Sequence, residues 1–197
     1  MDARIFIEFM NVMEHMKDNT RHSWTSGGRH ESVAEHSWRT ALMALMVKDE
    51  FPEADIDRVI RMCLLHDIGE AVTGDIPTFD KTDADEAEER RSLQRLVDRL
   101  PAPWPEDLTA LFDEMEAMET LEARIYKALD RMEAILQHNE ADISTWLPLE
   151  YQLNLTYGEA QVQFSEYMKA LRAELRADTL RKIAENTQIP QEEGHES

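Results

Sequence analysis

Apolar residues recur at helical spacing over most of the chain, and polar stretches separate the helices that they predict. A first helix is predicted over about 2–17. The polar stretch 19–31 has no periodicity and contains a glycine pair, so it predicts a long loop, a kind of segment that often carries function. Ser32, followed three residues later by Glu35, is a capping-box pattern. It predicts a second helix that runs to about Lys48.

The rest of the chain continues in the same way. Asp55 predicts the N-cap of a helix that reaches His66, and glycines and a proline break the following stretch into a second loop over 67–83. Further helices are predicted over 83–100, from about 106, over 119–139 and from 156 or 157 to about 184, with a short element at 146–149. We therefore expect one all-α domain over residues 1–187, a helical bundle, and a disordered tail over 188–197.

Composition and charge exclude several classes of function. The chain holds 6 glycines, without the close spacing that the phosphate loops of Walker-type and dinucleotide-binding proteins require. A formal charge of −20 repels a phosphate backbone, so nucleic-acid polymers are not expected partners. The sequence shows neither an uncharged leader segment nor a membrane-length apolar run, which predicts a cytoplasmic protein without a membrane partner. The single cysteine, Cys63, has apolar neighbours and is expected to be a buried thiol.

Candidate chemistry begins with His66 and Asp67, which are adjacent at a predicted helix end. Such a pair can direct an imidazole nitrogen and a carboxylate oxygen to one ion, but it also occurs by chance, and a histidine on an apolar face is more often an ordinary core residue. His36 also falls on the apolar face of its predicted helix. Two inward histidines on different helices need polar partners, and one shared metal ion would serve both.

Asp130 is a further candidate whose environment the pattern leaves open. It lies nearly opposite the main apolar stripe of its predicted helix, on a line of alanines at positions 123, 134 and 141. This placement is equally compatible with a solvated carboxylate and with a carboxylate buried where small side chains allow a close helix contact.

These residues together resemble a known family. His36 in ESVAEHS, His66 and Asp67 in LLHDIGEAVTGDIPT, and Asp130 in KALDRMEAIL resemble the H…HD…D pattern of the HD-domain metal-dependent phosphohydrolases. The run H-D-x-x-E-x-x-T-G-D-x-P-T is similar to the bacterial 5'-deoxynucleotidases and the eukaryotic HD domain-containing protein 2 group. The resemblance implies an HD-domain helical fold with a metal site between helices, and these four residues as ligands. Their mixed nitrogen and oxygen donors suit Mn, Co, Fe, Ni, Cu, Zn or Mg.

The resemblance also implies an activity. It predicts a 5'-nucleotidase that hydrolyses (deoxy)nucleoside 5'-monophosphates to nucleoside and phosphate, with Glu70 and Asp75 as catalytic residues beside the reacting phosphate. Each is otherwise an ordinary charge, Glu70 at a helix end and Asp75 in a turn. The substrate-binding candidates are polar or aromatic residues of the two loops, namely Arg21, Trp24, Arg29, Thr78 and Lys81.

One of these candidates departs from the bacterial pattern. In the bacterial deoxynucleotidases an arginine and a tryptophan are adjacent in the first loop, whereas here two residues separate Arg21 from Trp24, a spacing closer to that of the eukaryotic group. This spacing leaves the discrimination of 2'-deoxy sugars open. Trp24 is equally compatible with an aromatic residue that packs beneath the loop.

Two other functions remain possible on sequence grounds. One is an HD-type hydrolase of a cyclic or polyphosphorylated nucleotide, and the other is a non-catalytic helical regulatory module that keeps a metal ion for stability. Glu70 and Asp75 favour an enzyme, because a structural ion needs only its ligands.

Two side predictions concern assembly and His138. The apolar residues near the last predicted helix exceed what one bundle requires and predict a homodimer; they are Leu153, Leu155, Phe164, Tyr167, Met168 and Leu171. His138 closes its predicted helix, and we expect it to be a cation that caps the C-terminus of that helix.

Overall fold

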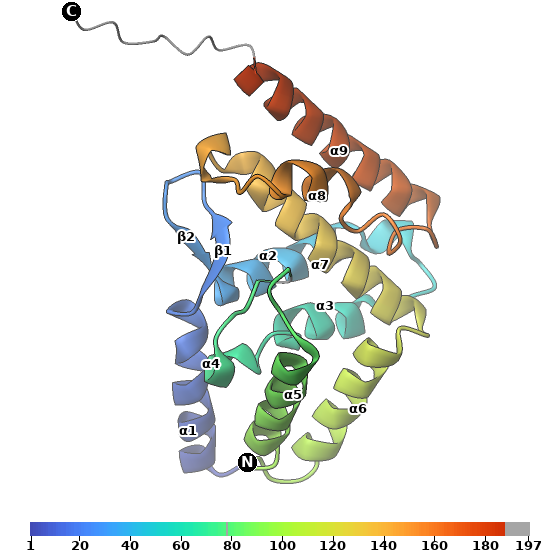
Figure 1. Cartoon of the computed structure of the whole chain (residues 1–197). Helices are drawn as coiled ribbons and strands as arrows, with labels where there is room; N and C mark the ends of the chain where they lie inside the picture. Colours follow the sequence, from blue (N-terminus) through green and yellow to red (C-terminus); the bar gives the residue numbers. More distant parts are fainter. Residues whose placement is uncertain (78, 188–197) are drawn as a thin grey trace, which may run out of the picture.

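The computed structural model describes residues 1–77 and 79–187, which form helices almost throughout (Figure 1). The all-α prediction is confirmed. In chain order the α-helices are α1 (Ala3–Met13), α2 (Val33–Met46), α3 (Ile56–Leu65), α4 (Glu70–Thr73), α5 (Asp83–Val97), α6 (Trp104–Ala117), α7 (Leu121–Glu140), α8 (Glu150–Thr156) and α9 (Glu166–Thr187). Short 3-10 turns lie at η1 (Glu14–Lys17), η2 (Lys48–Glu50) and η3 (Ile143–Thr145). The predicted tail 188–197 lies outside the described residues.

The prediction of a loop over 19–31 is wrong in one respect, because this stretch contains a β-hairpin. Strand β1 (Thr20–Trp24) pairs antiparallel with β2 (His30–Ser32), beside α1 and α2 in Figure 1. Gly28 adopts a φ of 79° in the connection, a conformation that favours glycine. Strands this short provide too few positions for an alternating pattern to be visible in the sequence.

Helix caps place the histidines. Ser32 and Glu35 form the predicted capping box at the start of α2, so His36 falls in the second turn, on the buried face. Asp55 caps α3 through the backbone N–H of Arg58, as predicted for that helix start. Because α3 ends at Leu65, His66 and Asp67 follow directly after its last turn. Outside the helix, two consecutive side chains can point to the same side.

The main core surrounds α7, which crosses the middle of the fold in Figure 1. Helices α2, α3 and α6 and strand β1 contact α7, and α9 packs on it as well. The fully buried side chains include Val59, Met62, Cys63, Ile125, Leu129 and Met132. Each large apolar side chain buried in this way contributes about 1.5–3 kcal/mol. The prediction of a buried Cys63 is confirmed.

The C-terminal helices differ from the prediction. The chain turns after α8, where Gly158 adopts a φ of 77°, and the last helix begins only at Glu166. Met168 is fully buried, and Phe164 and Leu171 pack against the main core, so most of the expected apolar surplus is used inside the fold. The second predicted loop also contains a short helix, α4, which begins at Glu70. Within 1–77 and 79–187, no helix combines the length and the apolar character needed to cross a membrane.

Candidate metal centre

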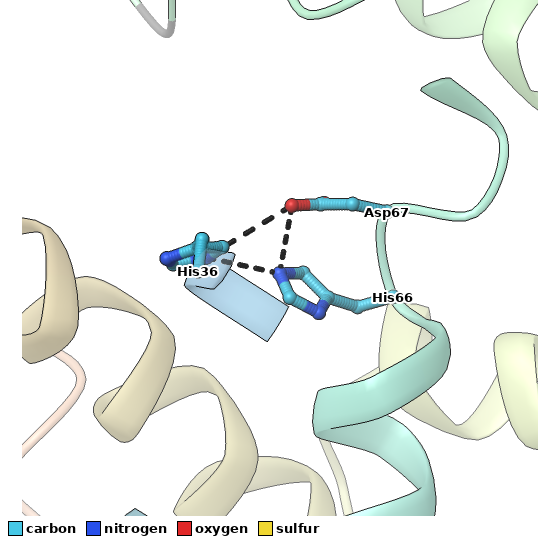
Figure 2. A group of neighbouring side chains, drawn as sticks. All are labelled: His36, His66 and Asp67. Atoms are coloured by element: carbon cyan, nitrogen blue, oxygen red, sulfur yellow. Dashed lines mark hydrogen bonds and ion pairs between the residues drawn. The ribbon is translucent and has the colours of Figure 1, made fainter. Parts of the chain in front are cut away.

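Two histidines and an aspartate from separate parts of the chain point toward one another (Figure 2). His36 comes from α2, and His66 and Asp67 come from the end of α3. The Nε2 atoms of His36 and His66 lie 3.2 Å apart. Asp67 Oδ2 lies 2.9 Å from His66 Nε2 and 3.9 Å from His36 Nε2. These three donor atoms lie close enough together to share one ion.

Asp130 of α7 completes what we call the four-residue cluster. Its Oδ1 lies 3.2 Å from His36 Nε2 and 3.7 Å from His66 Nε2. Its Oδ2 accepts a hydrogen bond of 2.8 Å from Lys127. The sequence left a solvated and a buried carboxylate open for this position, and the structure places it in the interior because α2, α3 and β1 cover this face of α7.

The outer nitrogens of both imidazoles are held by groups that accept hydrogen bonds. His66 Nδ1 donates to the backbone oxygen of Cys63 at 2.8 Å, and His36 Nδ1 donates to Glu133. Since a neutral imidazole carries one hydrogen, both Nε2 atoms present lone pairs to each other and to two carboxylates. Acceptors in this arrangement repel one another unless a positive charge lies among them. The residues therefore fit a metal ion, and groups behind the ligands fix both imidazole orientations.

Electrostatics lead to the same conclusion. Burial and Arg21 oppose protonation of His36, yet Glu133 and Asp130 raise the pKa of His36 to about 9. Burial acts against the charged form of Asp130, but Lys127 and both histidines hold its pKa well below the usual range. The surroundings thus favour positive charge at the cluster, which a proton on His36 Nε2 or a metal ion in its place can supply.

Glu133 is a residue of this site that the sequence analysis missed. It is fully buried, and its Oε1 lies 3.3 Å from Arg39 Nε. Burial raises the pKa of Glu133, but His36 and the neighbouring arginines outweigh it and keep the group ionised. Glu133 lies three residues after Asp130, on the same helix face, inside an apolar stretch. A charged residue among apolar neighbours in the sequence was the feature that could have identified Glu133 as a buried residue of the site.

Both predicted catalytic carboxyl groups lie within electrostatic reach of the cluster. Glu70 is 5% exposed, and its Oε2 is buried without a hydrogen-bond partner among the described residues. Burial, reinforced by Asp67 and Asp75, raises the pKa of Glu70 to about 10. Burial also raises the pKa of Asp75, although Arg21 opposes it. Glu70 therefore has an unmet hydrogen-bond requirement beside the cluster.

Arg21 is the substrate-binding candidate that the structure brings closest to the chemistry. Its side chain is largely buried on β1, with Nε 3.6 Å from Glu31 Oε2. Burial lowers the pKa of Arg21, but Glu133, Asp67 and Glu31 outweigh it and raise that pKa above its usual value. A permanently charged guanidinium fork here matches the oxygens of a phosphate.

The other loop candidates are placed differently. Lys81 pairs with Glu89 and interacts at longer range with Glu70 and Asp67. Thr78 lies outside the described residues.

Trp24 and Arg29 are engaged elsewhere in the hairpin region. The Trp24 ring lies against the His30 ring, with centroids 4.1 Å apart, as expected of an aromatic residue that packs in the loop. Arg29 is exposed, and its guanidinium group binds Glu35 rather than the four-residue cluster.

Two hollows adjoin the site. The large cleft, of about 710 Å³, lies among α5, α6 and α7 and reaches His66 and Lys127. The side cavity, of about 70 Å³, lies among β1, α7 and α8, and Arg21 and Asp75 are among its lining residues. The large cleft thus reaches a residue of the cluster itself, and the side cavity reaches two residues that lie within its electrostatic influence.

Comparisons with known proteins agree with this geometry. A family model described as HD domain matches residues 13–172, a span that includes the whole four-residue cluster. The 5'-deoxynucleotidase HDDC2 of Bos taurus is 34% identical over 142 residues, which cover 70% of this chain and 68% of that protein. The 5'-deoxynucleotidase HDDC2 of Homo sapiens is 32% identical over 142 residues, covering 70% and 69%.

A solved structure is also similar. It is the crystal structure of a predicted metal-dependent phosphohydrolase from Magnetospirillum magnetotacticum MS-1, with a TM-score of 0.77 and 31% identity. The match covers 91% of this chain and 93% of that one, so nearly all of the helical arrangement is shared.

Proposed function

Because this chain belongs to the HD-domain family, we propose that it is a metal-dependent 5'-nucleotidase that hydrolyses (deoxy)nucleoside 5'-monophosphates to nucleoside and phosphate. One observation carries the proposal: four side chains from three elements converge with both Nε2 lone pairs directed inward. The names of the bovine and human relatives support the substrate class. The resemblance to HD-domain proteins is confirmed.

His36, His66, Asp67 and Asp130 would hold the ion. A divalent ion of this kind, when bound, polarises a phosphoryl oxygen and lowers the pKa of bound water. Hydrogen bonds behind the ligands hold both imidazole rings in the orientation needed to bind the ion. The Cys63 carbonyl fixes His66, and Glu133 fixes His36.

The reaction breaks the bond between phosphorus and the 5'-oxygen and forms a bond from phosphorus to a water oxygen. We assign Glu70 to orient the attacking water and accept its proton, since its Oε2 lacks a partner among the described residues and the positive charge of a bound ion would lower its raised pKa. Asp75, whose pKa is raised by burial, is the candidate that returns a proton to the leaving 5'-oxygen. Arg21 holds the phosphate oxygens through the reaction.

Arg21→Ala is expected to raise KM for a nucleoside 5'-monophosphate about 10- to 100-fold, because hydrogen bonds to a charged group contribute about 1.5–3 kcal/mol. Metal content should not change. Steady-state kinetics with elemental analysis measure both quantities. Arg29→Ala is the matched control, since its guanidinium binds Glu35. An unchanged KM in Arg21→Ala removes Arg21 from the phosphate site.

A phosphate-release screen tests the function itself. We expect release from nucleoside 5'-monophosphates in the presence of a divalent ion, and slower turnover of cyclic and polyphosphorylated nucleotides. Faster turnover of either of those classes would replace the proposed substrate, and no release from any nucleotide would favour a regulatory module.

We also propose a homodimer in the cytoplasm, with a small nucleotide as substrate and neither nucleic acid nor membrane as partner. Support for the dimer comes from α2 rather than from the last helix: Trp38 is 61% and Met46 is 73% exposed, with Leu42 and Leu45 beside them. We expect a dimer mass by light scattering at micromolar concentration, and a monomer for Met46→Glu. A monomeric wild-type protein would refute this assembly.

A further inference from the structure

The side cavity contains polar atoms whose hydrogen-bonding capacity the protein does not meet. Glu150 and Asn154 of α8 line it, and they are 1% and 3% exposed. Neither Glu150 Oε1 nor Asn154 Nδ2 has a hydrogen-bond partner among the described residues. A buried polar atom without a partner is unfavourable because it has lost its hydrogen bonds to water. A ligand that supplies the missing partners would remove this cost.

The orientation of both side chains is fixed from behind. Glu150 Oε2 accepts a hydrogen bond of 2.6 Å from the backbone N–H of Leu147, which leaves Oε1 as the outer acceptor. Asn154 Oδ1 accepts a hydrogen bond of 3.1 Å from His138 Nδ1, which leaves the amide NH₂ as a donor. The cavity therefore presents an acceptor and a donor from neighbouring turns of one helix.

Two histidines line the cavity beside Glu150. His138 is not the helix-capping cation that the sequence predicted: it is largely buried, and burial lowers its pKa, so it is neutral near pH 7. With its hydrogen on Nδ1, its Nε2 is a second acceptor, 3.5 Å from Glu150 Oε1. His22 Nε2 lies 3.2 Å from the same oxygen but forms no hydrogen bond with it.

We propose that the side cavity receives the base of the nucleotide and prefers adenine or cytosine, which carry an amino group at C6 or C4 beside a ring nitrogen that has no hydrogen. This inference rests on the proposed function. The amino group donates to Glu150 Oε1 and His138 Nε2, and the ring nitrogen accepts from the Asn154 amide. Thymine and guanine carry a carbonyl oxygen in place of the amino group, and that oxygen would face two acceptors.

The position and shape of the cavity favour this occupant. Arg21 and Asp75 line the same cavity, so a phosphate at Arg21 leaves the nucleoside within reach of the polar groups of α8. The volume of about 70 Å³ admits the edge of one planar ring rather than a whole nucleoside. At the rim, Phe79 packs edge-to-face on His22, with centroids 5.7 Å apart, and offers apolar surface to the rest of the base.

The large cleft carries no comparable set of unmet groups. Three of its cations are already neutralised by carboxylates: Lys81 by Glu89, Lys127 by Asp130, and Arg90 by Glu116. Its size suits the passage of substrate and water, but these three cations have partners within the protein. The side cavity is therefore the stronger candidate for base recognition.

The test compares kcat/KM for the 5'-monophosphates of deoxyadenosine, deoxycytidine, thymidine and deoxyguanosine. We expect the two amino bases to be favoured at least about fivefold, since the carbonyl bases would leave buried polar groups unpaired. Glu150→Gln should greatly reduce this preference. Its carbonyl takes the Leu147 N–H, so its NH₂ faces the cavity and no longer accepts from the amino group of the base.

Two further variants provide a control and an independent test. Gln152→Glu, on the exposed side of α8, is the matched control and should leave the preference unchanged. Asn154→Asp exchanges the donor for an acceptor and should lower kcat/KM for the adenine and cytosine substrates about tenfold with unchanged metal content. This variant carries the test if Glu150→Gln does not fold.

The outcomes separate this inference from the proposed function. Equal kcat/KM for all four substrates, unaltered in Glu150→Gln and Asn154→Asp, would overturn the base site and leave the nucleotidase activity intact. If no monophosphate is hydrolysed, the proposed function fails. Calorimetry with deoxyadenosine and thymidine then tests whether the side cavity binds a base, independently of any activity. Tighter deoxyadenosine binding that Glu150→Gln abolishes would support the site, and absence of binding would overturn it.

Discussion

Replacing His66 with alanine is expected to remove the bound divalent metal and to lower phosphate release by at least about 10³-fold, while the fold is retained. His66 Nε2 lies within 3.7 Å of donor atoms from all three other members of the four-residue cluster, so its loss removes a central ligand of the metal site. Charge stabilisation by a metal ion contributes several kcal/mol to such a reaction, and each 1.36 kcal/mol is about tenfold in rate. Elemental analysis and phosphate release measure the two effects.

Two matched variants sharpen this prediction. His15→Ala removes an exposed histidine that contacts the backbone oxygen of Ala71 and should leave metal content unchanged. Asp130→Ala should lose metal as His66→Ala does, whereas the exposed Asp113→Ala should not. Full metal occupancy in His66→Ala would exclude it as a ligand, and full occupancy in Asp130→Ala would exclude that carboxylate.

Glu70→Gln is expected to lower kcat by about 10²- to 10⁴-fold, the usual contribution of a positioned acid or base. The amide keeps the size of the side chain but cannot take a proton from water. Since Glu70 lies outside the four-residue cluster, metal content and thermal stability should remain close to those of the wild type. Steady-state kinetics on the best monophosphate, with elemental analysis, provide the measurement.

The contrary outcomes are specific. A change confined to KM would assign Glu70 to substrate binding. Full turnover in Glu70→Gln would transfer the role to Asp75. The exposed Glu88→Gln on α5 controls for the loss of one negative charge from a strongly acidic chain and should keep full activity.

The sequence was sufficient where a single local pattern decides the outcome. The Ser32–Glu35 capping box and the Asp55 cap fixed the starts of α2 and α3, and those starts determine the direction of His36 and the place of His66. These features depend only on neighbours along the chain. The HD-domain motif extended the prediction to the fold.

Features that depend on distant packing could not be predicted from periodicity. Asp130 was ambiguous because α7 is covered on more than one side, so no single stripe marks its buried face. The hairpin was missed because its strands are short, and Glu133 because its charge is balanced by Arg39 of another helix. His138 was read as a cap because nothing near it in sequence reveals the burial that lowers its pKa.

The central claim, that this chain is a metal-dependent 5'-nucleotidase, is tested most directly by one metal-restoration measurement. Phosphate release from a deoxynucleoside 5'-monophosphate is followed after a chelator has removed bound metal, and again after a divalent ion is restored. We expect no release without the ion, recovery on its addition to the wild-type protein, and no recovery in His66→Ala. An undiminished rate in metal-free protein, or no release with any divalent ion, would contradict the account.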